Sequence, residues 1–312
     1  MRLLLRACVS VSLALSLLVD PADGCGATTH KTVAHRALST FSPPSQFAKY
    51  KEILEMNQGA LHAGSTFPDW LYLCGNDHGH GEFVHGMKYQ ELALAYIEAL
   101  PTPWDADTKE LISFLLGIVS HVEADRVWHE LAHVPFGYGF IGSLGAPDFG
   151  CYGNLHRCST AHQAADDGGE FIAAAQTNLM WPAHAAWNVP TRHLLNIFHS
   201  GDLMVSALSL DTCNTVFHLL LWLVRVLGAK VYALLAGKWR AKGPCVGTAE
   251  WMVPNYLHHP VGGVDDMAAR SQWQWERFAA SLEGRNSTAA HVNRSGVTRQ
   301  SRGIDAPPEP GP

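Results

Sequence analysis

Residues 106–129 read ADTKELISFLLGIVSHVEADRVWH, and this stretch decides the fold. Its middle is apolar, and its end places His121, Asp125 and His129 four residues apart. Four residues turn an α-helix through about 400°, so the three side chains form one polar stripe. The sequence therefore predicts a buried helix over Ala106–His129 whose inner end carries two imidazoles and a carboxylate.

A second stripe of the same kind lies downstream, where His162 and Asp166 are also four residues apart. Imidazoles and carboxylates that converge from two helices are a ligand set that zinc prefers. The alternative is a salt-bridged structural cluster, because ionisable groups on a buried helix must be paired or coordinated. The presence of two stripes favours the metal site.

The rest of the chain is dominated by helical periodicity, with Pro- and Gly-rich segments between the periodic stretches. We expect an all-α, single multi-helix domain with long loops. Besides the first helix, the pattern predicts helices over residues 30–39, 45–57, 85–99, 160–181, 191–198, 215–236 and 264–282. The very apolar stretch 216–237 contains Arg225 and Lys230, which favours a core helix over a membrane-touching one.

The N-terminal segment has the features of a secretory signal. Arg2 and Arg6 precede an apolar run, and Ala22-Asp23-Gly24 supplies the small residues of a cleavage site. We therefore expect residues 1–24 to be a signal peptide, Cys25 to be the mature N-terminus, and the protein to be secreted and extracellular.

Secretion agrees with the composition of the remaining chain. The cysteines beyond the signal segment are even in number, which predicts disulfides, with Cys151 and Cys158 suited to a local pair. Residues 25–284 form the predicted folded domain, and residues 285–312 are predicted to be a disordered tail. Asn286 and Asn293 begin two glycosylation sequons in that tail.

The formal net charge is −6 at pH 7. A mildly acidic chain lacks the general positive field that attracts polyphosphate. We therefore expect no nucleic-acid partner.

Further candidate ligands lie upstream of the first stripe. Asp69 follows Phe67-Pro68, in a turn fixed by proline, and His85 is expected to open a helix. His30 lies five residues after Cys25, whose free amino group and carbonyl oxygen could chelate a metal together. His133 lies one turn beyond His129 and is an alternative ligand to it.

Several motifs in this order resemble a known family. They are Cys25-Gly26-Ala27-Thr28-Thr29-His30, Phe67-Pro68-Asp69, Gly117-Ile118-Val119-Ser120-His121 with Asp125 and Trp128-His129, Ala161-His162 with Asp166, and Gly262-Gly263-Val264-Asp265-Asp266-Met267-Ala268. Together they are similar to the N-terminal catalytic domain of the glycosylphosphatidylinositol-specific phospholipase D family. That domain resembles in turn zinc-dependent phospholipase C and the single-strand-specific zinc nucleases.

The resemblance implies an all-α domain that holds three zinc ions in a cleft. Asp69, His85, His121 and Asp125 would hold one ion, and His129, His162 and Asp166 a second. Cys25, through its amino terminus, and His30 would hold the third, with Asp125 bridging. Two departures stand out: the zinc phospholipases C and nucleases usually begin with Trp where this chain has Cys25, and the spacing from Asp125 to His129 is tighter than theirs.

The resemblance also implies the reaction. The chain is expected to hydrolyse the inositol phosphodiester of glycosylphosphatidylinositol anchors by metal-activated water, with Asp69 as ligand and catalytic residue. Its substrates would be anchored proteins or phospholipid, met at a membrane surface that it contacts transiently. The alternatives are a zinc phospholipase C on ordinary phospholipids, a zinc nuclease, or a secreted lipid- or glycan-binding protein without turnover, since the family's C-terminal β-propeller has no counterpart here.

Overall fold

The computed structural model describes residues 26–69, 71, 78–129, 140, 165–166, 168–170, 172–173, 187–212, 214–215 and 245–295. Within these ranges every regular element is a helix, so the predicted all-α class is confirmed. The elements are α2 (Ala27–Thr40), η1 (Ser45–Phe47), α3 (Ala48–Met56), α4 (Gln58–Gly64), α6 (His78–His85), α7 (Met87–Glu98), α8 (Ala106–His129), α12 (Thr191–Ser200), α14 (Cys245–Asn255) and α15 (Val264–Ser295).

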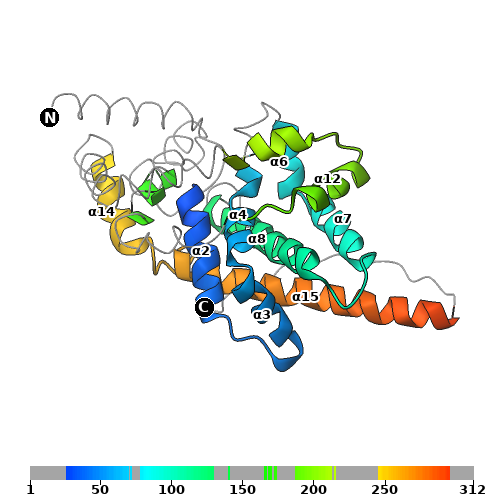
Figure 1. Ribbon diagram of the computed structural model, residues 1–312. Coiled ribbons are helices and arrows are strands. Elements are labelled where there is room, and N and C mark those ends of the chain that lie inside the picture. The colour runs from blue at the N-terminus through cyan, green and yellow to red at the C-terminus, as the bar shows by residue number, and fades with distance from the viewer. Residues whose placement is uncertain are drawn as a thin grey trace.

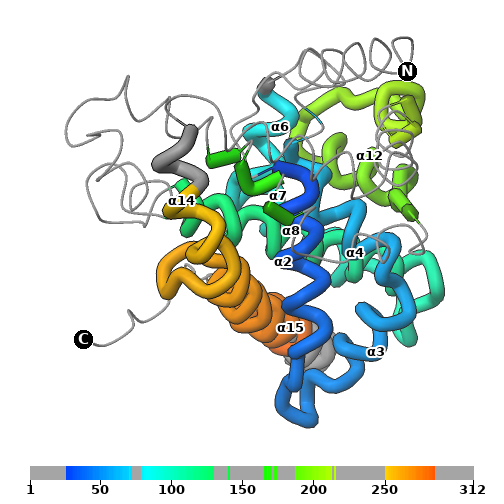
Figure 2. The backbone as a smooth tube through the Cα atoms, turned by 90° about the vertical axis from the view of Figure 1, so that its left-hand side faces the viewer, coloured from blue at the N-terminus to red at the C-terminus, as the bar shows by residue number. Residues whose placement is uncertain are grey.

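Helix α8 is the centre of the molecule, and its bounds are those predicted from the sequence. It is buried on nearly all sides from Thr108 to Trp128, as expected of a helix that is apolar around its circumference. Figure 1 shows α8 passing between α4, α7 and α15, and Figure 2 shows α2 lying across α8 and α15. The polar stripe of α8 therefore lies inside the helical layers.

Two glycines allow α4 and α8 to pack with their backbones in contact. A Cβ on Gly64 would lie 1.9 Å from the carbonyl oxygen of Phe114, and one on Gly117 would lie 2.3 Å from the carbonyl oxygen of Leu61. Any larger residue at either position would push the helices apart. This close packing brings Ser65, at the end of α4, beside the second half of α8.

Helix α15 packs along the other side of α8 through buried polar contacts as well as apolar ones. The indole N–H of Trp275 donates to the carbonyl oxygen of Leu116 at 2.8 Å, and the hydroxyls of Ser120 and Ser271 are 3.0 Å apart. These contacts satisfy groups that would be costly to bury without a partner. They fix α8 relative to the longest helix of the described chain.

Two candidate ligands occupy helical positions that differ from the prediction. His85 is the last residue of α6, not the first of a helix, because Gly86 is extended (φ −79°, ψ 152°) and separates α6 from α7. Asp69 is helical together with Phe67 and Pro68, not part of a turn. Proline is tolerated in the first turn of a helix, where its missing N–H has no partner to lose.

Helix α15 continues to Ser295, beyond its predicted end at Leu282. Residues 285–295 are drawn as part of this helix, and the predicted disorder of residues 285–312 stays a prediction. No proline lies between Pro260 and Pro307, and each added residue of an existing helix gains a backbone hydrogen bond without a new nucleation step. Residues 296–312 lie outside the described part of the chain.

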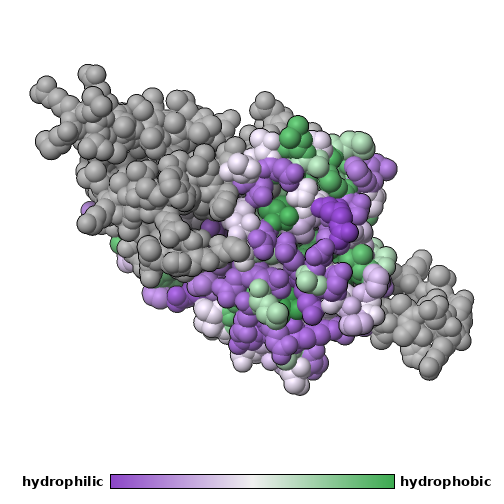
Figure 3. Space-filling model, viewed as in Figure 1, coloured by the Kyte–Doolittle hydropathy of each residue, from purple (hydrophilic) through white to green (hydrophobic). Residues whose placement is uncertain are grey.

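The surface is polar over α3, and apolar side chains gather over α6 and α12, in the upper right of Figure 3. The large exposed apolar residues in the described ranges are Met56, Met87, Met204 and Leu208. Among the described helices, none combines the length and the apolar character that crossing a bilayer would require.

Candidate metal centre

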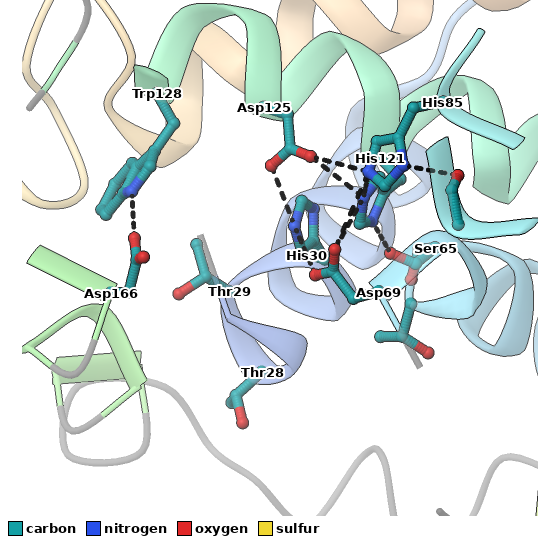
Figure 4. Close-up of polar contacts among 12 residues, drawn as sticks. Thr28, Thr29, His30, Ser65, Asp69, His85, His121, Asp125, Trp128 and Asp166 are labelled. Atoms are coloured by element: carbon teal, nitrogen blue, oxygen red, sulfur yellow. Dashed lines mark hydrogen bonds and ion pairs between the residues drawn. The ribbon is translucent and has the colours of Figure 1, made fainter. Parts of the chain in front are cut away.

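Four ionisable side chains converge at the inner end of α8. His121 and Asp125 come from α8, His30 from the first turns of α2, and Asp69 from the helical residues that follow α4. One nitrogen or oxygen atom of each lies within 4.8 Å of the others, and all four residues are buried. Figure 4 shows the four side chains pointing toward one another, with His85 beside them.

Asp125 lies between two groups of histidine nitrogens. Its Oδ1 is 3.2 Å from Nε2 of His30. Its Oδ2 is 3.1 Å from Nε2 of His121 and 3.3 Å from Nε2 of His85. The two oxygens of one carboxylate therefore face different imidazoles.

Asp69 repeats this arrangement from the opposite direction. Its Oδ2 is 3.4 Å from Nε2 of His30, and its Oδ1 is 3.4 Å from Nε2 of His121 and 3.8 Å from Nε2 of His85. Both carboxylates thus span the space between His30 and the His85–His121 pair. Each carboxylate could therefore bridge two metal ions, one beside His30 and one beside the His85–His121 pair.

Backbone carbonyls fix the orientation of two of the imidazole rings. His121 Nδ1–H donates to the carbonyl oxygen of Ser65, and His85 Nδ1–H donates to that of Gly81, each at 2.9 Å. When Nδ1 of a neutral imidazole carries the proton, Nε2 presents a lone pair. Both Nε2 atoms therefore face the carboxylates as potential metal ligands.

The charges of the cluster support each other. Burial alone would lower the pKa of His121, but Asp69 and Asp125 raise it to about 10. Burial alone would raise the pKa values of the two carboxyls, but His121 and His30 hold both below their ordinary range. The cluster therefore strongly favours a bound cation. In the metal-free protein this cation is a proton on His121, and a metal ion can take its place.

The donor atoms have a spacing that suits zinc. Zinc ligands about 2.0–2.1 Å from the ion are about 3.3 Å apart at the corners of a tetrahedron. The carboxylate–imidazole distances run from 3.1 to 3.8 Å among Asp69 Oδ1, Asp125 Oδ2, His85 Nε2 and His121 Nε2. The two Nε2 atoms are 3.0 Å apart. Asp69 Oδ1 is buried and makes no hydrogen bond. The residues present therefore fit a zinc ion.

His129 lies at the edge of this cluster, and Asp166 lies farther from it. His129 Nε2 is 3.7 Å from Asp125 Oδ1, so it faces the same carboxylate oxygen as His30. Asp166 accepts a hydrogen bond at 2.9 Å from the indole N–H of Trp128, and Figure 4 places it beside Trp128, apart from the central four residues. Trp128 thus orients the carboxylate of Asp166.

The remaining predicted ligands lie outside the described part of the chain. Cys25 and His162 lie outside the described residues, as does His133, the alternative to His129. The cysteines of the predicted disulfides are in the same position, because only the backbone of Cys245 is described.

Sequence reasoning missed the groups that hold the ligands in place. Ser65 and Gly81 act through their carbonyl oxygens, which no side-chain pattern reveals. Trp128 belongs to a motif, but only its contact with Asp166 gives it a role. Glu123, on the same helix as His121 and Asp125, pairs with Arg126 at 2.6 Å.

The comparison with known families agrees with this site. Residues 29–198 match the family described as zinc dependent phospholipase C. The chain belongs to this family. The matched stretch contains every described donor of the site, from His30 to Asp166, and the family name agrees with a zinc-binding cluster of histidines and aspartates.

Several relatives of this chain carry a more specific name than the zinc dependent phospholipase C family does. The chain is 33% identical over 269 residues to the phosphatidylinositol-glycan-specific phospholipase D of Dictyostelium discoideum, 31% over 266 residues to that of Mus musculus, and 32% over 252 residues to that of Homo sapiens. The matches cover 85%, 83% and 78% of this chain but only 26%, 29% and 28% of those proteins. No solved structure matches the chain.

Proposed function

We propose that this protein is a zinc-dependent phosphodiesterase that hydrolyses the inositol phosphodiester of glycosylphosphatidylinositol anchors, with a phospholipase D type of cut. The observation that carries the proposal is the pair of carboxylates, Asp69 and Asp125, that both span His30 on one side and His121 on the other. The names of the relatives support the substrate and the bond cleaved.

The donor set suits more than one ion. His85 and His121 face one oxygen of each carboxylate, and His30 faces the other oxygen of each. Zinc bound there would lower the pKa of a coordinated water and neutralise the phosphodiester charge. The three-ion complement implied by the family additionally needs Cys25, His129, His162 and Asp166.

Asp69 is the residue that we assign to the attacking water. It is buried, and its low pKa keeps it ionised at neutral pH. A carboxylate with such a low pKa is a weak base, so its contribution is to accept a hydrogen bond from the water and orient it toward phosphorus. The proton then passes on to solvent or to the leaving oxygen, without being retained on Asp69.

The place of action follows from the substrate. Anchored proteins reside on the outer face of membranes, and the N-terminal segment 1–24 has the composition of a secretory signal. We propose that the chain is secreted and meets its substrate transiently at the membrane surface. Edman sequencing of protein secreted from cultured cells tests this, since cleavage should leave Cys25 as the first residue.

The experiment that tests the function is a product analysis. Secreted protein is saturated with zinc and incubated with a glycosylphosphatidylinositol-anchored protein in detergent, and the lipids are identified by mass spectrometry. We expect phosphatidic acid, released only when zinc is present. Diacylglycerol without phosphatidic acid would instead indicate a phospholipase C cut, and no lipid product from fully zinc-loaded protein would favour a binding protein without turnover.

A further inference from the structure

The first turn of α2 is closed by a carboxylate from a distant part of the chain. The N-cap position is Gly26, so α2 has no side-chain cap of its own. Glu170 Oε1 accepts hydrogen bonds from the backbone N–H groups of Thr28 at 2.7 Å and Thr29 at 3.2 Å. The first N–H groups of a helix have no partner within it, and negative charge is favourable there.

The backbone before His30 is shaped around this carboxylate. Gly26 has a φ of +83°, and a Cβ at this position would lie 2.5 Å from Glu170 Oε1. The His30 N–H donates to the carbonyl oxygen of Gly26 at 3.1 Å. The helical turn that carries His30 therefore starts at a residue packed directly on Glu170.

The segment that carries Glu170 also carries Asp166, four residues earlier. Residues 165–166 and 168–170 of this segment are helical. A Cβ on Gly169 would lie 3.1 Å from the hydroxyl of Thr29 and 3.4 Å from the Trp128 ring. This segment is therefore packed closely on both α2 and α8. The same short stretch contacts the helix that carries His30 and the indole that orients Asp166.

We propose that Glu170 is a positioning residue that holds the first turn of α2, and thereby His30, at the metal centre. The inference rests on the zinc site proposed above. Glu170 contacts the backbone N–H groups of Thr28 and Thr29 in α2, so it acts through His30 and not as a ligand itself. Without it, two buried N–H groups lose their acceptor, and the turn that carries His30 can fray away from Asp69 and Asp125.

A double-mutant cycle with His30 tests this role. Zinc bound per folded chain and zinc affinity are measured for the wild type, Glu170→Ala, His30→Ala and the double variant, together with the absorption spectrum of the cobalt-substituted proteins. We expect Glu170→Ala to weaken zinc binding at least about tenfold and to change the cobalt spectrum as His30→Ala does. The double variant should lose no more than His30→Ala alone, because both act on the same ligand.

Asp105→Ala is the matched control. Asp105 also caps a helix, accepting from the Thr108 N–H at 2.8 Å, but it lies at the end of α8 remote from His121. It should lower thermal stability and leave zinc affinity and the cobalt spectrum unchanged. Additive losses of zinc affinity in the double variant, or an equal loss in Asp105→Ala, would overturn the role of Glu170.

Glu170→Gln keeps the test decisive if the alanine variant does not fold. The amide oxygen can still accept from Thr28 and Thr29 but carries no charge, so zinc binding should weaken several-fold, between wild type and alanine. A loss of zinc affinity in Glu170→Gln that adds in full to the loss in His30→Ala would then contradict the proposal. A wild-type protein that binds no zinc at all would reject the metal centre itself, which is a distinct result.

Discussion

The Nε2 atoms of His85 and His121 lie 3.0 Å apart, and each ring donates its Nδ1–H to a backbone carbonyl. Two imidazoles held in this way point lone pairs at each other, which is unfavourable unless a proton or a metal ion lies between them. The backbone of α4 and α6 thus prepares a cation site before any cation binds.

Asp125→Asn should abolish zinc binding at the centre while the protein stays folded. The amide keeps the shape of the side chain but loses the charge that faces four histidines. The loss of affinity should exceed the roughly 10–100-fold that removal of an outer support costs. Hydrolysis should fall to background. Metal analysis of the purified variant, together with circular dichroism, measures both effects.

The control for this variant is Asp107→Asn, the same substitution at the exposed start of the same helix. It removes an ion pair with Arg192 at 3.0 Å, and exposed pairs contribute little. Full zinc content and full activity are expected. Retention of zinc and turnover in Asp125→Asn as well would reject the assignment of the site.

The stability of the metal-free protein should fall as the pH rises above neutrality. The pKa of His121 is raised from 6.5 to about 10 in the folded state, so its contribution is complete below pH 6.5 and is lost as the pH approaches 10. The pKa values of Asp69 and Asp125 are lowered, so their contribution is complete above pH 3.8 and is lost on acidification. The metal-free cluster is therefore most stabilising between these limits.

Zinc should reverse this dependence, because it binds the deprotonated nitrogen and displaces the proton. The increase in Tm on zinc addition should thus be larger at about pH 8.5 than at about pH 5.5. Calorimetry with chelator and with excess zinc measures it, and His121→Gln should show a smaller pH effect in chelator. A metal-free Tm that rises between these two pH values in wild type but not in His121→Gln would contradict the prediction.

Gly117→Ala should disrupt the packing that places Ser65 beside His121. The new methyl group would lie 2.3 Å from the carbonyl oxygen of Leu61, a backbone atom that cannot move independently. Overpacking of this kind costs about 1–3 kcal/mol, and zinc affinity should fall as α4 moves from α8. Chemical denaturation and metal titration measure the two effects.

Gly284→Ala is the control for that substitution. A Cβ at Gly284, in α15, would meet nothing within 4 Å, so alanine should stabilise the helix by about 0.5–1 kcal/mol. Zinc affinity should not change. Equal stability of Gly117→Ala and wild type would mean that the helices can separate without cost.

The sequence predicts the part of the site that one helix determines. The spacing of His121 and Asp125 fixes them on one face of α8 wherever the helix lies, because the geometry is local. The all-α class follows in the same way from the periodicity of the apolar residues. Both depend on neighbours within a few residues along the chain.

The parts that the sequence does not predict depend on contacts between distant elements. The carbonyl oxygen of Ser65 reaches His121 only because Gly64 and Gly117 let two helices touch. Every residue has such a carbonyl, so no pattern distinguishes this one. The position of His85 at the end of α6 likewise depends on the extended backbone of Gly86, which periodicity does not indicate.

Trp128→Phe should weaken the outer part of the metal site without disturbing the core. Phenylalanine keeps most of the apolar packing on Phe140, whose ring stacks at 4.3 Å, but removes the N–H that donates to Asp166. Asp166 then loses this hydrogen bond, and the affinity for the zinc ion that the proposed three-ion site assigns to Asp166 should fall about 10–100-fold. Trp275→Phe is the matched control, since it removes a buried indole donor to Leu116 on the other side of α8. Both variants should lose about 1–3 kcal/mol of stability, so a zinc deficit shared equally by both would show that general destabilisation, and not Asp166, is the cause.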